Sequence, residues 1–288
     1  MKIIGIFQEV IYEHRIAKLS VSRSTPYYEN VAGPSEIKMR IATWNVNGIR
    51  ARQTQFMEWV ERDAPDVICL QEIKASPAQV PAYLSDLPGY WNYWHGAGGY
   101  SGVSMHIRQD ALAEPPQFSH PTFDFETRIV QATIGPAVVA SVYVPNGGKD
   151  FAAKVNFLKA LQQYAAQTHT VGFDLILCGD LNVARTDQDV HPQERRLVIG
   201  QRPDERRLFE DILHQGLVDV GRVLDPDNDR LFSWWAPWRN MRQRNIGWRI
   251  DYILASAALA QRASACSVLA DVGTSDHAPV VATFDLSG

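Results

Sequence analysis

From Met39 onward, short apolar runs that suit β-strands alternate with stretches of helical periodicity. The strand candidates are 39–45, 66–71, 102–108, 128–134, 137–144, 174–179, 249–255 and 278–285. The helical candidates are 52–63, 151–167 and 204–215. In the second of these helices Phe151, Val155, Leu158 and Leu161 fall on one face. Because no linker or low-complexity break interrupts the alternation, it predicts one α/β domain of layered sheets and helices.

Residues 1–38 have a different composition. Short apolar pieces are mixed there with Ser, Tyr, Pro and Glu, as in STPYYENVAGPSEIK, and no period is sustained. Such a segment offers little apolar surface to bury. We therefore expect a poorly ordered N-terminal extension over 1–38, followed by a single domain over 39–288. A regulatory or partner-binding arm is the alternative.

The cysteines and the hydropathy narrow the class of protein. Three cysteines, an odd number without regular spacing, argue against a disulfide framework or a zinc cluster. They are Cys69, Cys178 and Cys266, and we interpret them as reduced core residues. No apolar run approaches the roughly 18 residues that span a membrane, and Glu9 interrupts the N-terminal stretch too early for a signal peptide. We expect a cytoplasmic protein with no membrane partner.

The charge is distributed unevenly. A net charge of −4 argues mildly against a nucleic-acid partner. However, the segment 231–250 has no acid and carries Arg239, Arg242, Arg244 and Arg249. Four unpaired positive charges in one loop would repel each other, and phosphate binding would relieve that repulsion. The same segment contains four tryptophans, for which core packing is the alternative, above all for Trp235.

Acids and amides accumulate where the predicted strands end. They are Asn45, Asn47, Glu72, Asp180, Asn182, Asp251, Asp276 and His277. Strand ends present side chains to a common cleft, and such oxygen ligands suit Mg²⁺ rather than Zn²⁺. An aspartate near His277 in space would hold its tautomer and raise its basicity. Taken singly, Asp180 could be a capping residue and His277 a turn residue; together, in this order, they predict a hard-cation site with acid–base groups.

Seven motifs carry a family resemblance. WNVNGIR, LQEIK, GYSGV, YVPNGG, GDLNVA, GWRIDYIL and SDHAP, in this order, resemble the exonuclease III family of abasic-site (AP) endonucleases, within the endonuclease/exonuclease/phosphatase superfamily. The resemblance covers roughly Met39 to Leu286. It implies a DNase I-like fold, a four-layered α/β sandwich of two packed mixed β-sheets flanked by helices. GDLN and SDH are shared with other phosphodiesterases, whereas WNVNGIR, YVPNGG and GWRIDY indicate the DNA-repair branch.

The resemblance also implies roles for individual residues. The metal, Mg²⁺ with Mn²⁺ as a substitute, would be bound by Glu72, with Asn45 and Asp276 nearby. The implied catalytic residues are Tyr143, Asn146, Asp180, Asn182, Asp251 and His277. Asp180 would activate the attacking water or protonate the leaving group. His277, oriented by Asp251, would bind the phosphate as an imidazolium or act as a base, and the two readings stay open.

The implied DNA contacts lie in several motifs. They are Arg50, Tyr100, Arg128, Lys149, Trp234, Trp238, Arg242, Arg244 and Trp248. Trp234, Trp248 and Ile250 would line the pocket for a flipped abasic deoxyribose, with Trp238 at the intercalating tip of its loop. Two positions depart from the family pattern. Asn47 stands where some members have Asp, and Lys149 where some relatives have an Arg that enters the DNA.

The function expected from this resemblance is a DNA-repair phosphodiesterase. It would incise duplex DNA 5′ to abasic sites, with 3′–5′ exonuclease and 3′-end repair activity in base excision repair. Its partner would be double-stranded DNA with abasic sites or blocked 3′ ends, bound by a monomer. Another phosphodiesterase or phosphatase of the same fold is one alternative, which the Trp/Arg segment disfavours. An inert nucleic-acid-binding regulator is another, which the complete set of acids disfavours.

Overall fold

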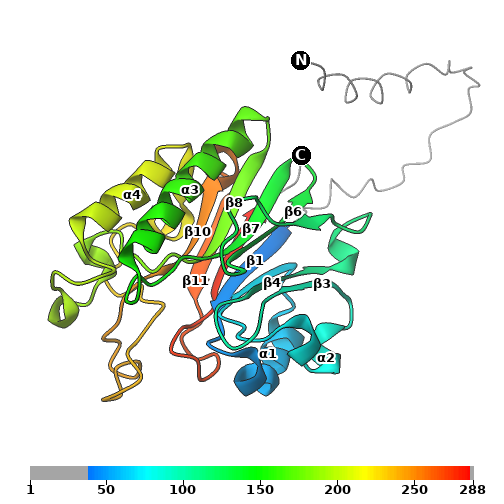
Figure 1. The fold of residues 1–288 in the computed structure, drawn as a ribbon, viewed down its shortest axis with the longest axis horizontal. Coiled ribbons are helices and arrows are strands. Elements are labelled where there is room, and N and C mark those ends of the chain that lie inside the picture. The colour runs from blue at the N-terminus through cyan, green and yellow to red at the C-terminus, as the bar shows by residue number, and fades with distance from the viewer. Residues whose placement is uncertain (1–37, 286–288) are drawn as a thin grey trace, which may run out of the picture. The chain divides into compact units, whose positions relative to one another are not determined.

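The computed structural model describes residues 38–285, which form two six-stranded sheets (Figure 1). The first has the strand order β11-β12-β1-β2-β4-β3 and the second β5-β6-β7-β8-β10-β9. The first sheet consists of β11 (Ala263–Val268), β12 (Val280–Asp285), β1 (Lys38–Asn45), β2 (Val67–Gln71), β4 (Val103–Arg108) and β3 (Tyr90–His95). The second consists of β5 (Phe118–Ser119), β6 (Ile129–Ile134), β7 (Ala137–Tyr143), β8 (Asp174–Asp180), β10 (Asp251–Ser256) and β9 (Leu217–Asp219).

Both sheets are mixed. β1 pairs in parallel with β2, and β7 with β8, while the other pairs are antiparallel. The central strands are buried on both faces, which explains their continuous apolar runs. In β7, Val139 and Tyr143 point into the core between the sheets, whereas Val138 and Val142 point to the outer face of their sheet.

Helices cover the two outer faces (Figure 1). The α-helices are α1 (Ile49–Asp63), α2 (Ala82–Ser85), α3 (Phe151–Thr170), α4 (Pro203–Leu213), α5 (Val220–Leu224) and α6 (Ala257–Ala260). Phe56 and Trp59 of α1 pack on the first sheet. Leu158 of α3 and Phe209 of α4 pack on the second. The order helix, sheet, sheet, helix confirms the predicted four-layered sandwich.

The eight predicted strands and three predicted helices are present, with bounds shifted by a few residues. The four strands that the sequence did not predict, β3, β5, β9 and β11, are the edge strands of the two sheets. In β11 every residue is at least partly exposed. An edge strand with mixed exposure has no continuous apolar run, and therefore gives no periodic signal.

Two sequence expectations bear on the ends of the chain and on membranes. The predicted extension 1–38 lies outside the described residues except for Lys38, which opens β1, so its order stays a prediction. Within residues 38–285, none of the helices has the length and apolar character needed to cross a membrane. The three cysteines are all free thiols. Cys69 and Cys178 are buried as predicted, whereas Cys266, also predicted for the core, is only partly buried.

The strand register brings the polar strand ends to one edge of the sandwich. Tyr143, Asp180 and Asp251 lie side by side at the ends of three neighbouring strands of the second sheet. Asn45 is paired with Gln71 at the ends of β1 and β2 in the first sheet. The candidate functional residues of both sheets therefore lie at the same edge of the sandwich.

Candidate active site

The centre of the site is a set of contacts between the two sheets. The side-chain amide of Asn45, at the end of β1, donates to Glu72 Oε1 at 2.9 Å and to Asp180 Oδ2 at 2.9 Å. Asn45 is fully buried and Asp180 is 1% exposed. Asn45 thus holds the predicted metal ligand Glu72 and the predicted catalytic acid Asp180, one beside each sheet, at a defined separation. Carboxylates this close would repel each other without such a donor.

His277 is fixed by a carboxylate and a hydroxyl behind it. Its Nδ1 lies 2.9 Å from Asp251 Oδ2, and Ser233 Oγ donates to the same oxygen at 2.6 Å. This arrangement places the proton of Nδ1 toward Asp251 and turns Nε2 to Asp180, whose Oδ2 is 3.9 Å away. Burial by itself lowers the pKa of His277, but Asp251, and further off Asp180, outweigh it and raise the pKa to about 10. His277 is therefore an imidazolium at neutral pH.

The pKa of Asp180 is also raised, because this acid is buried and lies near other acids. Burial is the main cause that raises its pKa to about 7, and the charges of Asp251 and Glu72 add to it. His277 and the hydrogen bond from Asn45 act against this shift. A carboxyl group that titrates near neutral pH can accept and return a proton at the working pH. Asp180 is thus the group best suited to proton transfer.

The donor set fits a hard divalent cation. One ligand atom from each of Glu72, Asp180 and His277 lies within 4.8 Å of the others. With His277 protonated, the remaining donors are oxygens, which Mg²⁺ and Mn²⁺ prefer. Burial would raise the pKa of Glu72, but hydrogen bonds from Asn45 and Lys74 hold it below its usual value. Glu72 is therefore ionised and available as a ligand.

Lys74 and Asp276 complete this side of the site. Sequence reasoning missed Lys74, whose Nζ lies 2.9 Å from Glu72 Oε2 and donates to Asn47 Oδ1 at 2.6 Å. Asn47 in turn donates to Asp276 Oδ1 at 2.8 Å, and Trp234 Nε1 donates to Oδ2 at 3.0 Å. In this chain the Asn47 amide thus links Lys74 to Asp276. The LQEIK motif itself contains Lys74 and was the available signal.

Tyr143 and Arg128 form the opposite wall. The guanidinium of Arg128 lies 4.6 Å from the Tyr143 ring centroid and 5.2 Å from that of Tyr100. Its Nη2 donates to the Tyr100 hydroxyl at 2.9 Å, while Nη1 is buried without a hydrogen-bond partner among residues 38–285. Burial raises the pKa of Tyr143, so its hydroxyl stays protonated and can donate. Asn146 and Lys149 line the hollow next to Arg128.

A buried lysine that the sequence gave no reason to select anchors this wall. Lys154 of α3 is fully buried and forms an ion pair with the equally buried Glu205 of α4. Its Nζ donates to the backbone oxygen of Asn182 at 2.7 Å and reaches that of Asn146 at 3.4 Å. Glu205 Oε2 accepts from the backbone of Gly200 at 2.8 Å. One ion pair thus ties together three loops of the cleft.

A cleft of about 280 Å³ opens over these groups. It is lined by Glu72, Asn146, Asp180, Asn182, Ile199, Gly200, Trp234, Trp248, Ile250, Asp276 and His277. Trp234 and Trp248 meet edge to face with ring centroids 5.4 Å apart. At Gly200, which has φ +90°, a Cβ would come within 2.9 Å of the Trp248 ring. The apolar end of the cleft is therefore preorganised by this packing, and it lies next to Asp180 and Asp276.

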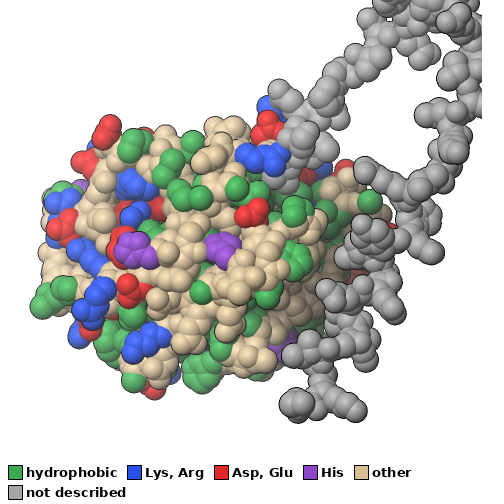
Figure 2. All heavy atoms as spheres, turned by 90° about the horizontal axis from the view of Figure 1, so that it is seen from above, with side chains coloured by type: hydrophobic (Ala, Val, Ile, Leu, Met, Phe, Trp, Pro, Cys, Tyr) green, Lys and Arg blue, Asp and Glu red, His purple; other side chains and the backbone are tan. Residues whose placement is uncertain are grey.

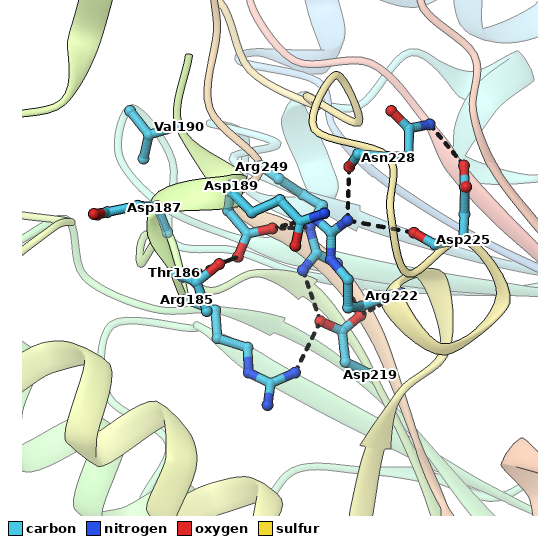
Figure 3. A network of polar contacts seen from close by, with 12 residues as sticks. Arg185, Thr186, Asp187, Asp189, Val190, Asp219, Arg222, Asp225, Asn228 and Arg249 are labelled. Atoms are coloured by element: carbon cyan, nitrogen blue, oxygen red, sulfur yellow. Dashed lines mark hydrogen bonds and ion pairs between the residues drawn. The ribbon is translucent and has the colours of Figure 1, made fainter. Parts of the chain in front are cut away.

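The arginines of 231–250 are not four unpaired charges, and that expectation is wrong. Arg249 is buried in an ion-pair network (Figure 3). It contacts Asp189 at 2.7 Å and Asp219 at 2.7 Å. Arg242 donates to the backbone oxygens of Ala270 and Val272 and packs on the Trp235 ring. The ion-pair network of Arg249 fixes the backbone next to Trp248. The hydrogen bonds of Arg242 join its loop to the backbone at Ala270 and Val272.

The other two arginines of 231–250 and one of its tryptophans lie at the surface. Arg239 and Arg244 are exposed, and Trp238 is 59% exposed at the loop that Figure 1 shows in gold projecting from the sandwich. Arg50 is also exposed, at the start of α1. Trp235, in contrast, is buried as core packing requires. The face shown in Figure 2 carries Lys and Arg interspersed with Asp and Glu, so that face presents no area of a single sign.

The chain is similar to known proteins in sequence and in fold. Residues 42–277 match the model of the endonuclease/exonuclease/phosphatase family. An exodeoxyribonuclease of Bacillus subtilis is 36% identical over 84% of this chain and 98% of its own length.

Two solved structures extend the comparison. A 3′ phosphatase of Neisseria bound to a product DNA hairpin is 31% identical and covers 86% of this chain and 99% of that chain, with a TM-score of 0.78. An AP endonuclease of Archaeoglobus fulgidus is 31% identical, covers 86% of this chain and 100% of that chain, and has a TM-score of 0.77. The chain therefore belongs to the endonuclease/exonuclease/phosphatase family, and within it to the exodeoxyribonuclease III and AP endonuclease group of DNA-repair nucleases.

Proposed function

We propose that this nuclease uses Mg²⁺ to cut duplex DNA 5′ to abasic sites, and that it also trims and repairs 3′ ends. The observation that carries the proposal is a single cleft in which an apolar wall adjoins a wall of acid–base groups. Trp234, Trp248 and Ile250 form an apolar end that directly adjoins Asp180 and His277. A deoxyribose without its base would fit against the indoles, whereas an intact nucleotide would carry a base into the same space.

The cleft offers positive charge and donors to a phosphate. His277, with a pKa of about 10, presents Nε2 as an imidazolium donor. The protonated Tyr143 hydroxyl and the unpartnered Nη1 of Arg128 lie on the opposite wall. Charge-assisted donors of this kind stabilise the charge that develops on the equatorial oxygens during phosphoryl transfer. We assign His277 to phosphate binding rather than to the role of base.

Asp180 is then the proton acceptor. A water oxygen attacks phosphorus in line, its proton passes to Asp180, and the bond from phosphorus to the leaving O3′ breaks. With a pKa of about 7, Asp180 can take that proton and pass it on to the departing oxygen. Asn182 keeps this carboxylate oriented, since its backbone N–H donates to Oδ1 at 2.9 Å.

Glu72 would hold the cation, with Asn45 and Asp276 beside it. Their oxygen donors suit Mg²⁺, and Mn²⁺ could substitute. When bound there, the ion supplies charge neutralisation at a phosphoryl oxygen. The Lys74 ammonium, 2.9 Å from Glu72 Oε2, already neutralises part of the local negative charge. We therefore expect weaker binding of the ion than at a site without a lysine.

The test uses purified protein, Mg²⁺ and two labelled duplexes, one with a single abasic analogue and one intact, with Glu72→Ala as the inactive control. Rapid incision 5′ to the analogue and slower loss of 3′ nucleotides from both duplexes are expected. Hydrolysis of small phosphodiesters with no cut in either duplex would favour the alternative phosphodiesterase. Binding of both duplexes without any cleavage would favour the regulator. We further propose that the enzyme acts as a monomer, which sedimentation with and without DNA can test, and that it lies in the cytoplasm, which cell fractionation can test.

A further inference from the structure

A second group of metal-ligating side chains lies outside the active site. It consists of His95 at the end of β3, and His120 and Asp124 in the segment that follows β5. One ligand atom from each residue lies within 4.8 Å of the others. None of the three lines the catalytic cleft. They are brought together by the tertiary structure, since 25 positions separate the two histidines.

The carboxylate of Asp124 is already oriented as a ligand would be. Its Oδ1 accepts from the backbone N–H groups of Arg128 at 2.8 Å and Ile129 at 3.1 Å. Its Oδ2 faces His95 Nε2 at 2.5 Å. Burial would raise the pKa of Asp124, but the hydrogen bonds from His95 and from the backbone hold it below its usual value. Hydrogen bonds that fix one oxygen and leave the other for an ion are typical of metal-binding carboxylates.

The two imidazoles lie one on the other. The rings of His95 and His120 are 4.5 Å apart between centroids and inclined by 10°. His95 is partly buried, while His120 is exposed and open to solvent. Ligand atoms on one tetrahedral zinc at about 2.0–2.1 Å lie about 3.3–3.4 Å apart. The pair His95 Nε2 and Asp124 Oδ2, at 2.5 Å, would therefore have to open slightly to admit an ion. Because His120 is at the surface, its ring can turn inward to meet an ion.

From this arrangement we propose that His95, His120 and Asp124 form a second divalent-cation site, selective for Zn²⁺, Co²⁺ or Ni²⁺. Two imidazole nitrogens and one carboxylate oxygen suit these ions. Mg²⁺, in contrast, prefers oxygen ligands and keeps several waters. The two sites of this chain therefore differ in chemistry, which allows them to be filled separately. Water would complete the coordination on the exposed side.

Binding at this site would act on the neighbouring wall of the catalytic cleft. An ion that binds His95 Nε2 and Asp124 Oδ2 replaces the hydrogen bond between these two atoms. Asp124 also holds the backbone of Arg128, which packs on Tyr100 and Tyr143. Loading the site should consequently stabilise the wall of the catalytic cleft and raise the melting temperature.

The experiment measures ion binding directly and does not depend on nuclease activity. Full-length protein carrying Glu72→Gln, which weakens the active-site position, is titrated with Zn²⁺ by calorimetry and with Co²⁺ by visible absorption, in excess Mg²⁺. His120→Ala and His95→Ala are compared in the same background. His214→Ala removes another exposed histidine and serves as the matched control. Thermal melting checks that every variant is folded.

One ion per chain is expected, with affinity reduced about tenfold or more in His120→Ala and unchanged in His214→Ala. His120→Ala decides the question, because an exposed side chain can be removed without harm to the fold. Equal Zn²⁺ and Co²⁺ binding in the parent and in His120→Ala would overturn the proposal. Binding that is lost when Glu72→Gln is introduced into wild type, and is insensitive to His120, would place the ion in the active site. Neither result would affect the proposed nuclease function.

Discussion

Replacing Lys154 by methionine should destabilise the protein and slow cleavage together. The methionine keeps most of the volume of the side chain but removes the ammonium, which contacts Glu205, Asn182 and Asn146. Glu205 is then left as a fully buried carboxylate without its cation. Within residues 38–285 it keeps as hydrogen-bond donors the backbone N–H groups of Gly200 and Arg202, at 2.8 and 3.2 Å.

The size of the effect follows from these contacts. Breaking a buried ion pair by removing one partner costs about 3–5 kcal/mol. The two N–H donors that Glu205 retains place Lys154→Met near the lower end, at about 3 kcal/mol. In a domain of this size that lowers the melting temperature by about 6–12 °C. Because the double variant Lys154→Met/Glu205→Gln removes both charges, it should cost less than the sum of the two single variants.

The rate of cleavage tests whether Lys154 positions the loops of the active site. The Lys154 ammonium holds the backbone of Asn146 and Asn182, both predicted as catalytic residues. A displacement of about 1 Å can cost about 10²-fold in rate. We expect kcat to fall about 10–100-fold, with little change in KM for abasic duplex. Lys159→Met, on the exposed side of the same helix, is the control. If Lys154→Met lost less than about 1 kcal/mol and cut at half the normal rate or better, the reasoning would be refuted.

Three further outcomes are expected. Asp180→Asn should reduce kcat by about 10²–10⁴-fold and leave duplex affinity nearly intact; cleavage at a tenth of the wild-type rate would contradict its role in proton transfer. Trp248→Ala should impair incision at an abasic analogue but spare binding of intact duplex, and equal losses in gel-shift titrations of the two duplexes would argue against the sugar pocket. Burial lowers the pKa of His106 from 6.5 to about 3, so its contribution to stability is present above about pH 6.5 and lost as the pH falls toward 3. Urea unfolding of wild type and His106→Gln between pH 7 and 4 should show a flatter pH dependence in the variant, and identical slopes would disprove this account.

The interior strands and long helices could be predicted because their signals are local. A strand such as β7 is buried on both faces, and its apolar run is visible without knowledge of its neighbours. The order of motifs also placed Asp180, Asp251 and His277 at strand ends, where the structure brings them together. Local periodicity and motif order together determine the fold class and most of the candidate site.

Contacts between distant residues depended on the tertiary structure. Arg249 belongs to the arginine-rich segment 231–250, which suggested phosphate contact, yet its guanidinium binds Asp189 and Asp219, which lie 60 and 30 positions away. Lys154 gave no signal of its own in the sequence, and only the packing of α3 against α4 buries it against Glu205. A charged side chain has the same local sequence signal whether it meets water, a phosphate or a buried partner. Which of these it meets depends on the groups that folding brings within a few ångströms, and these come from parts of the chain that no local pattern connects.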